Sequence, residues 1–251
     1  MHAIARSLPA LAASTFLLLA AGPAGAVPCG ATVGDDNASG DTYFAARWAC
    51  RQDYVNFFWT AYHFDQQDWD EGFGFENVCD VNLPLARTFN ALYALHYAVA
   101  NPATQPGDFS GNILRWGGNY ARTHIDELDG RCQGDNALAF TMWGPIIDNY
   151  TELYAPFFYG TSVVERASTI LHESRHADGW LHDAPDSSCL RHASCDSSWN
   201  YDGANRWQVT WLWWYRNEAT DTTPAMKARA KDRGNDVILN GFAANPGFLI
   251  P

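Results

Sequence analysis

The sequence has few charged residues and no surplus of basic ones. Only 18% of its 251 residues are charged, and 16 Lys and Arg stand against 28 Asp and Glu, which gives a formal net charge of −12. A protein that binds nucleic acid or adsorbs to an anionic membrane needs basic surface against phosphate or lipid headgroups. The charge balance therefore argues against both partners, and we interpret the acidity as a contribution to solubility.

A hydrophobic run long enough to span a bilayer is also lacking. The apolar run from Leu8 to Ala21 follows Arg6 and precedes the small residues Ala24-Gly25-Ala26, which is the pattern of a secretory signal peptide. It is shorter than the roughly 20 apolar residues of a membrane-spanning helix. We therefore expect a signal peptide over 1–26 and a mature protein over 27–251. The mature protein would be secreted or periplasmic and would carry no membrane anchor.

No pair of cysteines has the C-x-x-C spacing, which argues against a cysteine zinc knuckle. An even number of cysteines behind a signal peptide indicates an oxidising compartment and up to three disulfides. Many pairings are open, and only the short spacing of Cys189 and Cys195 favours one of them. The six cysteines are Cys29, Cys50, Cys79, Cys132, Cys189 and Cys195.

Internal repeats and runs of alternating strands are absent, while apolar residues recur at spacings of three and four. This periodicity predicts a mainly α fold, a single compact helical domain with irregular disulfide-bearing loops. A bend at Gly117-Gly118 and a kink or split at Gly144-Pro145 are expected. The predicted helices span 42–64, 85–100, 112–128, 137–154, 162–178, 205–219 and 224–242.

The helix predicted at about 162–178 has the clearest end signals and carries the motif of interest. Ser162 and Glu165 form the S-x-x-E capping box, and Gly179 is a natural C-terminal stop. On a helix, positions four apart share a face, so His172 and His176 can present their imidazoles to one metal ion.

The string HESRHADGWLH, residues 172–182, adds a third histidine and a glutamate. Glu173 follows the first histidine, where its carboxylate can reach a water on the metal. A catalytic zinc site needs three protein ligands and one open position. His182 can supply the third ligand only if the chain stops and turns, and Gly179 allows that turn because glycine reaches positive φ without a side-chain clash.

This H-E-x-x-H-x-x-G-x-x-H string resembles the zinc signature of the metzincin metallopeptidases. The resemblance implies that His172, His176 and His182 bind Zn2+, that Glu173 polarises the attacking water, and that the substrate is a peptide or protein. Metzincins also place a sheet before this helix and a methionine turn beneath the zinc. Here the periodicity predicts helices instead of the sheet, and the only downstream methionine, Met226, lies at a predicted helix start.

Two other residues remain candidates for the third metal ligand. Glu218 resembles the glutamate ligand of the thermolysin-like zincins, although Asp221 is one position short of their E-x-x-x-D pattern. His192, in the Cys189–Cys195 loop, is another alternative. Asp178 is either an acceptor that orients an imidazole or a solvated residue at a helix end. Arg175, Tyr201 and Tyr215 are candidate donors to an oxyanion.

The remaining aromatic and histidine residues are more typical of packing than of chemistry. His63, His96 and His124 stand alone in helical segments, and we expect core or surface roles for them. Trp207, Trp211 and Trp214 recur at helical spacing, which indicates core packing or else an exposed binding platform. The sequence thus predicts a secreted zinc-dependent hydrolase, most simply a metallopeptidase. The alternative is a non-catalytic extracytoplasmic module that binds glycan or peptide and holds a structural metal or a histidine cluster.

Overall fold

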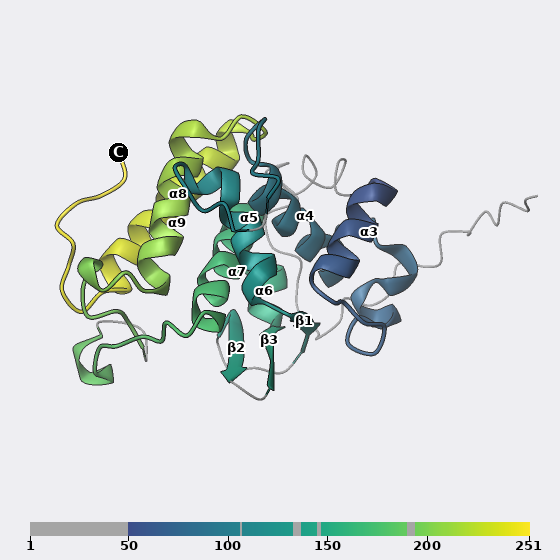
Figure 1. Ribbon diagram of the computed structural model, residues 1–251, viewed down its shortest axis with the longest axis horizontal. Coiled ribbons are helices and arrows are strands. Elements are labelled where there is room, and N and C mark those ends of the chain that lie inside the picture. The colour runs from purple at the N-terminus through teal and green to yellow at the C-terminus, as the bar shows by residue number, and fades with distance from the viewer. Residues whose placement is uncertain (1–49, 106, 133–136, 145–146, 190–193) are drawn as a thin grey trace, which may run out of the picture.

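The computed structural model describes residues 50–105, 107–132, 137–144, 147–189 and 194–251. This part of the chain folds into helices with one small sheet (Figure 1). The helices are α3 (Gln52–Ala61), α4 (Pro84–Tyr97), α5 (Ile113–His124), α6 (Ala155–Tyr159), α7 (Val163–Ala177), α8 (Ala204–Glu218) and α9 (Pro224–Asn240). The strands are β1 (Glu127–Gly130), β2 (Ala139–Gly144) and β3 (Ile147–Leu153), and short 3₁₀ turns lie at Glu71–Phe73, Phe75–Asn77, Asp186–Ser188 and Trp199–Tyr201.

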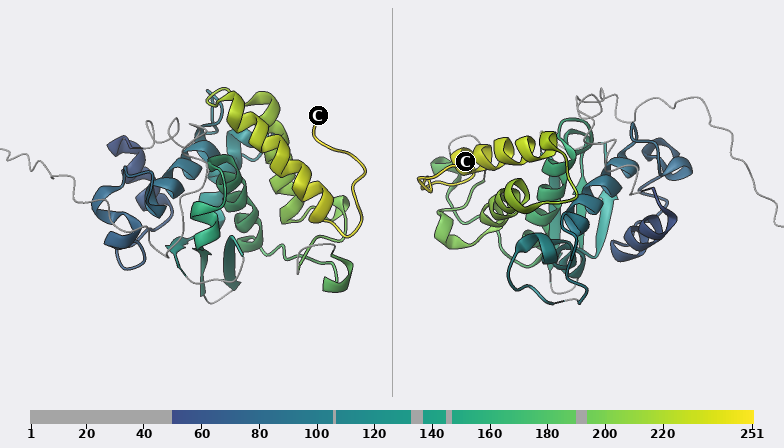
Figure 2. Two further views of the ribbon diagram at one scale, coloured as in Figure 1. Left: turned by 180° about the vertical axis from the view of Figure 1, so that it is seen from behind. Right: turned by 90° about the horizontal axis from the view of Figure 1, so that it is seen from above.

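Helix α7 lies in the middle of the molecule. It packs against α4 and α5 on one side and against α8 and α9 on the other, and strand β2 runs beside it (Figures 1 and 2). Its apolar side chains are fully buried, and burial of each Val, Ile or Leu contributes about 1.5–3 kcal/mol of stability. These residues are Val163, Val164, Ala167, Ile170 and Leu171. The helix that carries the histidine motif is therefore held rigidly from several directions.

Both ends of α7 are fixed by the predicted signals. At the start, Ser162 accepts a hydrogen bond from the Glu165 backbone N–H at 3.4 Å, and Glu165 accepts one from the Ser162 N–H at 2.8 Å, so the capping box is present. At the end, Gly179 adopts a φ of +88°. The Trp180 N–H reaches the Arg175 carbonyl at 3.1 Å and the Gly179 N–H reaches the His176 carbonyl at 2.8 Å, which is the Schellman pattern.

The predicted helix over 137–154 was wrong. Strands β2 and β3 occupy this segment, and their pairing is irregular between Met142 and Gly144. The segment is rich in β-branched and aromatic residues, which favour strands, and the Gly-Pro break leaves each half too short for a stable helix. Pairing with β1, which is distant in sequence, supplies the third strand, and no local periodicity reveals such a partner.

The sheet has the order β1-β3-β2, with β1 parallel and β2 antiparallel to β3. Strand β2 is therefore an edge of the described sheet, and it is the strand that lies against α7. Thr141 on β2 faces Thr151 on β3, and their hydroxyls are 2.8 Å apart. The coarse prediction of a mainly helical protein holds for the described residues, and the sheet before α7 is the feature that it missed.

The bend predicted at Gly117-Gly118 does not interrupt α5, which runs through both residues as one continuous helix. A Cβ on Gly118 would lie 2.4 Å from the His96 ring, and one on Gly117 would lie 3.3 Å from Trp211. The two glycines therefore allow α5 to approach α4 and α8 closely, which is a packing role and not a hinge.

The disulfides indicate an oxidising environment. Cys50 pairs with Cys79, and Cys189 pairs with Cys195 as the sequence suggested. None of the cysteines in the described part of the chain is free. The predicted signal peptide and Cys29 lie outside the described residues. Within those residues, no helix combines the length and the apolar character that a bilayer crossing requires.

Candidate metal centre

The structure brings the three predicted histidines together at the end of α7. Their ligand nitrogens all lie within 4.8 Å of one another. His172 and His176 come from successive turns of the helix, and their Nε2 atoms are 3.1 Å apart. His182 returns to them after the Gly179 turn, with its ring centroid 5.3 Å from that of His172 and 4.7 Å from that of His176. A rigid continuation of the helix could not have placed it there.

Two of the imidazoles are oriented by acceptors on their far side. The Nδ1 of His176 lies 2.7 Å from the Trp180 carbonyl oxygen, and the Nδ1 of His182 lies 2.8 Å from a carboxylate oxygen of Asp196. Both partners accept a hydrogen bond, so each Nδ1 carries the proton and each Nε2 keeps its lone pair. This is the tautomer that binds a metal ion, and hydrogen-bonded carboxylates and carbonyls commonly support metal-binding histidines in this way.

The third imidazole, that of His172, is held in its neutral form. Burial lowers the pKa of His172 well below its ordinary value, and the charges that His176, His182 and Arg233 carry when protonated lower it further; Gln208 opposes the shift. A neutral imidazole is the form that coordinates metal. Three convergent histidines fit a divalent ion such as zinc, which accepts nitrogen ligands in this number.

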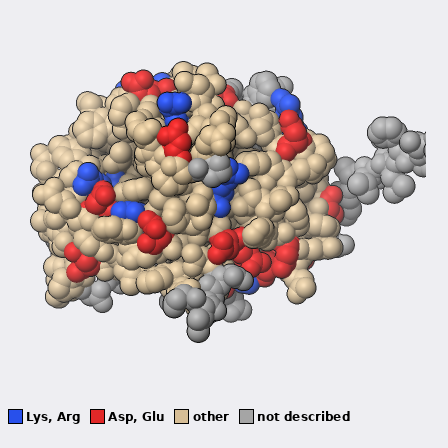
Figure 3. Space-filling model, in the orientation of Figure 1, with Lys and Arg blue, Asp and Glu red and all other residues tan. Residues whose placement is uncertain are grey.

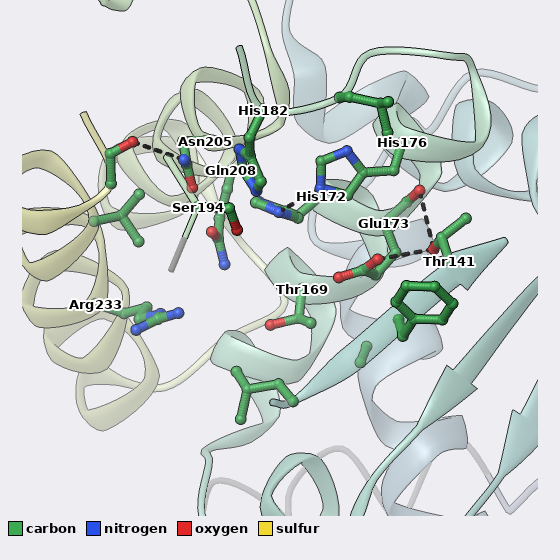
Figure 4. A pocket seen from close by; sticks show the side chains of 16 residues that line it. Thr141, Thr169, His172, Glu173, His176, His182, Ser194, Asn205, Gln208 and Arg233 are labelled. Atoms are coloured by element: carbon green, nitrogen blue, oxygen red, sulfur yellow. Dashed lines mark hydrogen bonds between the residues drawn. The ribbon is translucent and has the colours of Figure 1, made fainter. Parts of the chain in front are cut away.

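The histidines open onto a pocket of about 490 Å³ (Figure 4). Glu173 lines the same pocket, is 6% exposed, and accepts a hydrogen bond from the Thr141 hydroxyl at 2.8 Å. Thr141 lies on the edge strand β2, so the sheet that the sequence missed positions the glutamate that the sequence identified. Figure 4 shows Thr141 and Glu173 on one side of the histidines and Arg233 on the other.

The rest of the pocket is built by segments far apart in the sequence. Thr169 lies on the same face of α7 as His172 and His176, at helical spacing, and could have been found from that spacing. The N-terminal half of α8 and the middle of α9 supply the opposite wall, for which no local pattern gave a signal. The other polar side chains that line the pocket are Ser194, Asn205, Gln208 and Arg233.

The proposed oxyanion donors do not line the pocket. Arg175 is 5% exposed and sits between two indole rings, 4.1 Å from the ring centre of Trp180 and 4.2 Å from that of Trp207, so its role is structural. Tyr201 donates to the Leu181 carbonyl at 2.6 Å, and Tyr215 is fully buried. This part of the prediction was wrong because the sequence did not show which way these side chains point.

Neither alternative third ligand is found beside the histidines in the described part of the chain. Glu218 is exposed at the last residue of α8 and does not line the pocket. His192 lies outside the described residues. Asp178 orients no residue of the histidine cluster: it binds Arg175 at 2.9 Å and lies 3.3 Å from His124. The orienting carboxylate is Asp196, which is fully buried and which the sequence did not single out.

The isolated histidines and the tryptophan stripe take packing or surface positions, as expected. His63 is exposed, and His96 is buried with its Nε2 2.8 Å from the Tyr62 hydroxyl, where burial lowers its pKa to about 3. Of the tryptophans, Trp211 is fully buried and Trp207 packs against α5, while Trp214 is 40% exposed. These three tryptophans therefore form no common exposed platform.

A second group of acidic side chains lies near β1, where acidic residues gather on the lower part of the face in Figure 3. Asp65, Asp68 and Glu127 have oxygens within 4.8 Å of one another. Arg131 forms ion pairs there with Asp68, with Asp129 at 3.1 Å and with Glu152 at 3.4 Å. This group carries its own counter-charge, and we assign no metal to it.

Comparison with known proteins finds no relative of this chain. No protein-family model, no curated protein and no solved structure matches the chain. What the protein can do chemically must therefore follow from the geometry of the histidines, Glu173 and the pocket.

Proposed function

We propose that the protein is a secreted zinc-dependent hydrolase whose substrates are peptides or proteins. The observation that carries the proposal is the combination of three convergent histidines with a buried glutamate in one open pocket. The donor set fits zinc, and zinc held there would polarise a substrate carbonyl and acidify a water molecule.

The side chains of the protein then provide proton transfer and positioning. Glu173 receives a proton from the attacking water and passes it to the leaving amine, as a general base and then a general acid. Thr141 holds the carboxylate against β2 by its 2.8 Å hydrogen bond, so that Glu173 stays beside the histidines. Burial of the helix on both sides fixes the distance between base and ligands.

The edge strand supports a peptide as the substrate. Strand β2 runs along the pocket, and Leu138, Ala139, Phe140 and Thr141 line it. An exposed strand edge offers backbone N–H and C=O groups with which an extended peptide can pair. Phe140 is 48% exposed and Met142 is 39% exposed, so apolar side chains of a bound peptide would find contacts there.

A non-catalytic metal module is the alternative, and the site offers less support for it. A structural zinc site is closed by a fourth protein ligand. Within the described ranges, the histidine group has three members and no fourth His, Cys, Asp or Glu joins it. A structural site also has no use for a glutamate beside the first ligand.

Metal content and activity of matched variants test the proposal. We expect near one zinc per chain in the wild type, a strong loss of zinc in His182→Ala, and zinc retained in Glu173→Gln. Glu173→Gln should lose peptide hydrolysis about 100-fold or more, because the amide keeps the bond to Thr141 but accepts no proton. Glu218→Gln makes the same chemical change on the surface and should leave both properties intact.

Two outcomes would contradict the proposal. Absence of bound metal after zinc loading and dialysis would remove its basis. Full activity of Glu173→Gln on a casein digest would show that the glutamate is not the base.

A further inference from the structure

One end of the pocket is polar and positively charged, and the hydrolytic chemistry described above does not use it. Among the described residues that line the pocket, Arg233 is the only Arg or Lys. Figure 4 shows its side chain entering the pocket from α9, on the side opposite Glu173. Its side chain is 21% exposed, so the charge is neither fully solvated nor fully buried.

Two polar atoms of residues that line the pocket lack partners within the described part of the chain. The Nε of Arg233 is buried and has no hydrogen-bond partner, although its NH1 forms an ion pair with Asp236 at 2.8 Å. The Oγ1 of Thr169 is also buried without a partner, on a residue that is 4% exposed. A buried donor without an acceptor costs stability, so such atoms commonly mark a place that a ligand completes.

We infer that Arg233, together with Thr169 and Gln208 of the same pocket, forms a subsite that binds a carboxylate group of the substrate close to the scissile bond. The inference rests on the proposed function, because it assigns a preference to the same pocket. A carboxylate fits the donors: guanidinium forms charge-assisted hydrogen bonds with it, and a hydroxyl and an amide can donate to its remaining lone pairs. The substrate class is therefore a peptide with an acidic side chain beside the cleaved bond or with its own C-terminal carboxylate there.

Electrostatics gives the subsite its selectivity. The chain as a whole is acidic, with a net charge of −12, so it repels anions at long range. The guanidinium of Arg233, which is paired with Asp236 at 2.8 Å, places a partly buried cation inside the pocket, and partial burial strengthens a charge-assisted bond. In the metal-free pocket, a carboxylate is therefore favoured near Arg233 and disfavoured beside Glu173, which lies on the opposite side.

Two matched substitutions on α9 separate the subsite from general charge effects. Arg233→Gln removes the cation and keeps a polar, although shorter, side chain. Arg229→Gln makes the same change one helical turn away, at an exposed residue that does not line the pocket. The zinc-loaded mature protein is incubated with a mixed peptide library, and cleavage positions are read by mass spectrometry.

We expect cleavage to concentrate beside Asp or Glu, or at the C-terminus, in the wild type and in Arg229→Gln. Arg233→Gln should lose this preference by about 10-fold or more, the worth of a charge-assisted hydrogen bond. A second library with amidated C-termini distinguishes a side-chain carboxylate from a C-terminal carboxylate. If cleavage beside acidic residues persists, the subsite recognises the side chain. If cleavage disappears, the subsite recognises the terminal carboxylate. Cleavage without acidic preference, or a preference that survives in Arg233→Gln, overturns the inference and leaves the hydrolase proposal standing.

A binding measurement decides the inference even if no peptide is cleaved. Succinate and the neutral, isosteric succinamide are titrated into metal-free protein at pH 8, above the ordinary pKa of histidine of about 6.5. We expect succinate to bind at least about 10-fold more tightly than succinamide in the wild type and in Arg229→Gln, but not in Arg233→Gln. That result without peptide cleavage would refute the proposed reaction and support the subsite. Equal binding of the two probes would refute the subsite.

Discussion

Asp196 is the residue whose substitution tests the architecture of the candidate metal centre most directly. Its Oδ1 lies 2.8 Å from the Nδ1 of His182, and its Oδ2 lies 3.2 Å from the backbone nitrogen of Asn205 at the start of α8. Both neighbours therefore donate to the carboxylate. Asp196 is fully buried, so no water replaces either bond when one is lost.

The change Asp196→Asn keeps the size of the side chain and replaces one acceptor by an NH₂ donor. If the amide nitrogen faces Asn205, two donors meet. If it faces His182, it donates to Nδ1 and moves the histidine proton to Nε2, which is the atom that would bind a metal ion. Either arrangement weakens the site, and loss of such an orienting partner typically lowers metal affinity 10- to 100-fold, or by about 1.4–2.7 kcal/mol.

The assay is a competitive zinc titration against a chelator of known affinity, with the thermal unfolding of the metal-free protein measured alongside. Asp183→Asn is the matched control: Asp183 is exposed, follows His182 directly, and accepts hydrogen bonds from the backbone N–H and hydroxyl of Ser197 at 2.6 and 2.7 Å. We expect its zinc affinity to stay within about twofold of the wild type. An Asp196→Asn protein that folds normally and binds zinc as tightly as the wild type would refute the role of Asp196 in orienting His182.

Two further predictions follow from single residues. Gly179→Ala should cost about 1–2 kcal/mol of stability, because the residue has a φ of +88°, although nothing lies within 4 Å of the new Cβ. It should also weaken zinc binding, because the strained turn displaces His182. Gly247→Ala, at a φ of +80° and with a Cβ equally free of contacts, should cost a similar amount and leave zinc affinity unchanged when both variants are compared by urea unfolding and zinc titration. Burial, with the charge of Asp68 second, raises the pKa of Asp129 from 3.8 to about 7, and Arg131 opposes this shift. The folded state therefore binds this proton more tightly than the unfolded state and loses stability as pH rises from about 4 to 7. Asp129→Asn should reduce that loss in urea unfolding at a series of pH values, and an unchanged pH profile would contradict the assignment.

The sequence by itself determined the local features of the centre. Ser162, Glu165 and Gly179 fix where α7 starts and ends through bonds within a few residues, and such bonds are visible as short motifs. The spacing of His172, His176 and Glu173 along one helix also depends only on helical geometry. For this reason the histidines and the glutamate could be selected from their spacing alone, and the fold brings them into one pocket.

Tertiary structure decided everything that depends on partners distant in the chain. The sheet arises because β3 pairs with β1 across a long connection, and residues 137–154 show this preference only weakly by themselves. The orienting role of Asp196, the support of Glu173 by Thr141 and the entry of Arg233 from α9 each join segments separated by many residues. Periodicity reports which face of an element is apolar, but the direction of a polar side chain is set by the packing of the whole fold, and so these three residues could be assigned only from the structure.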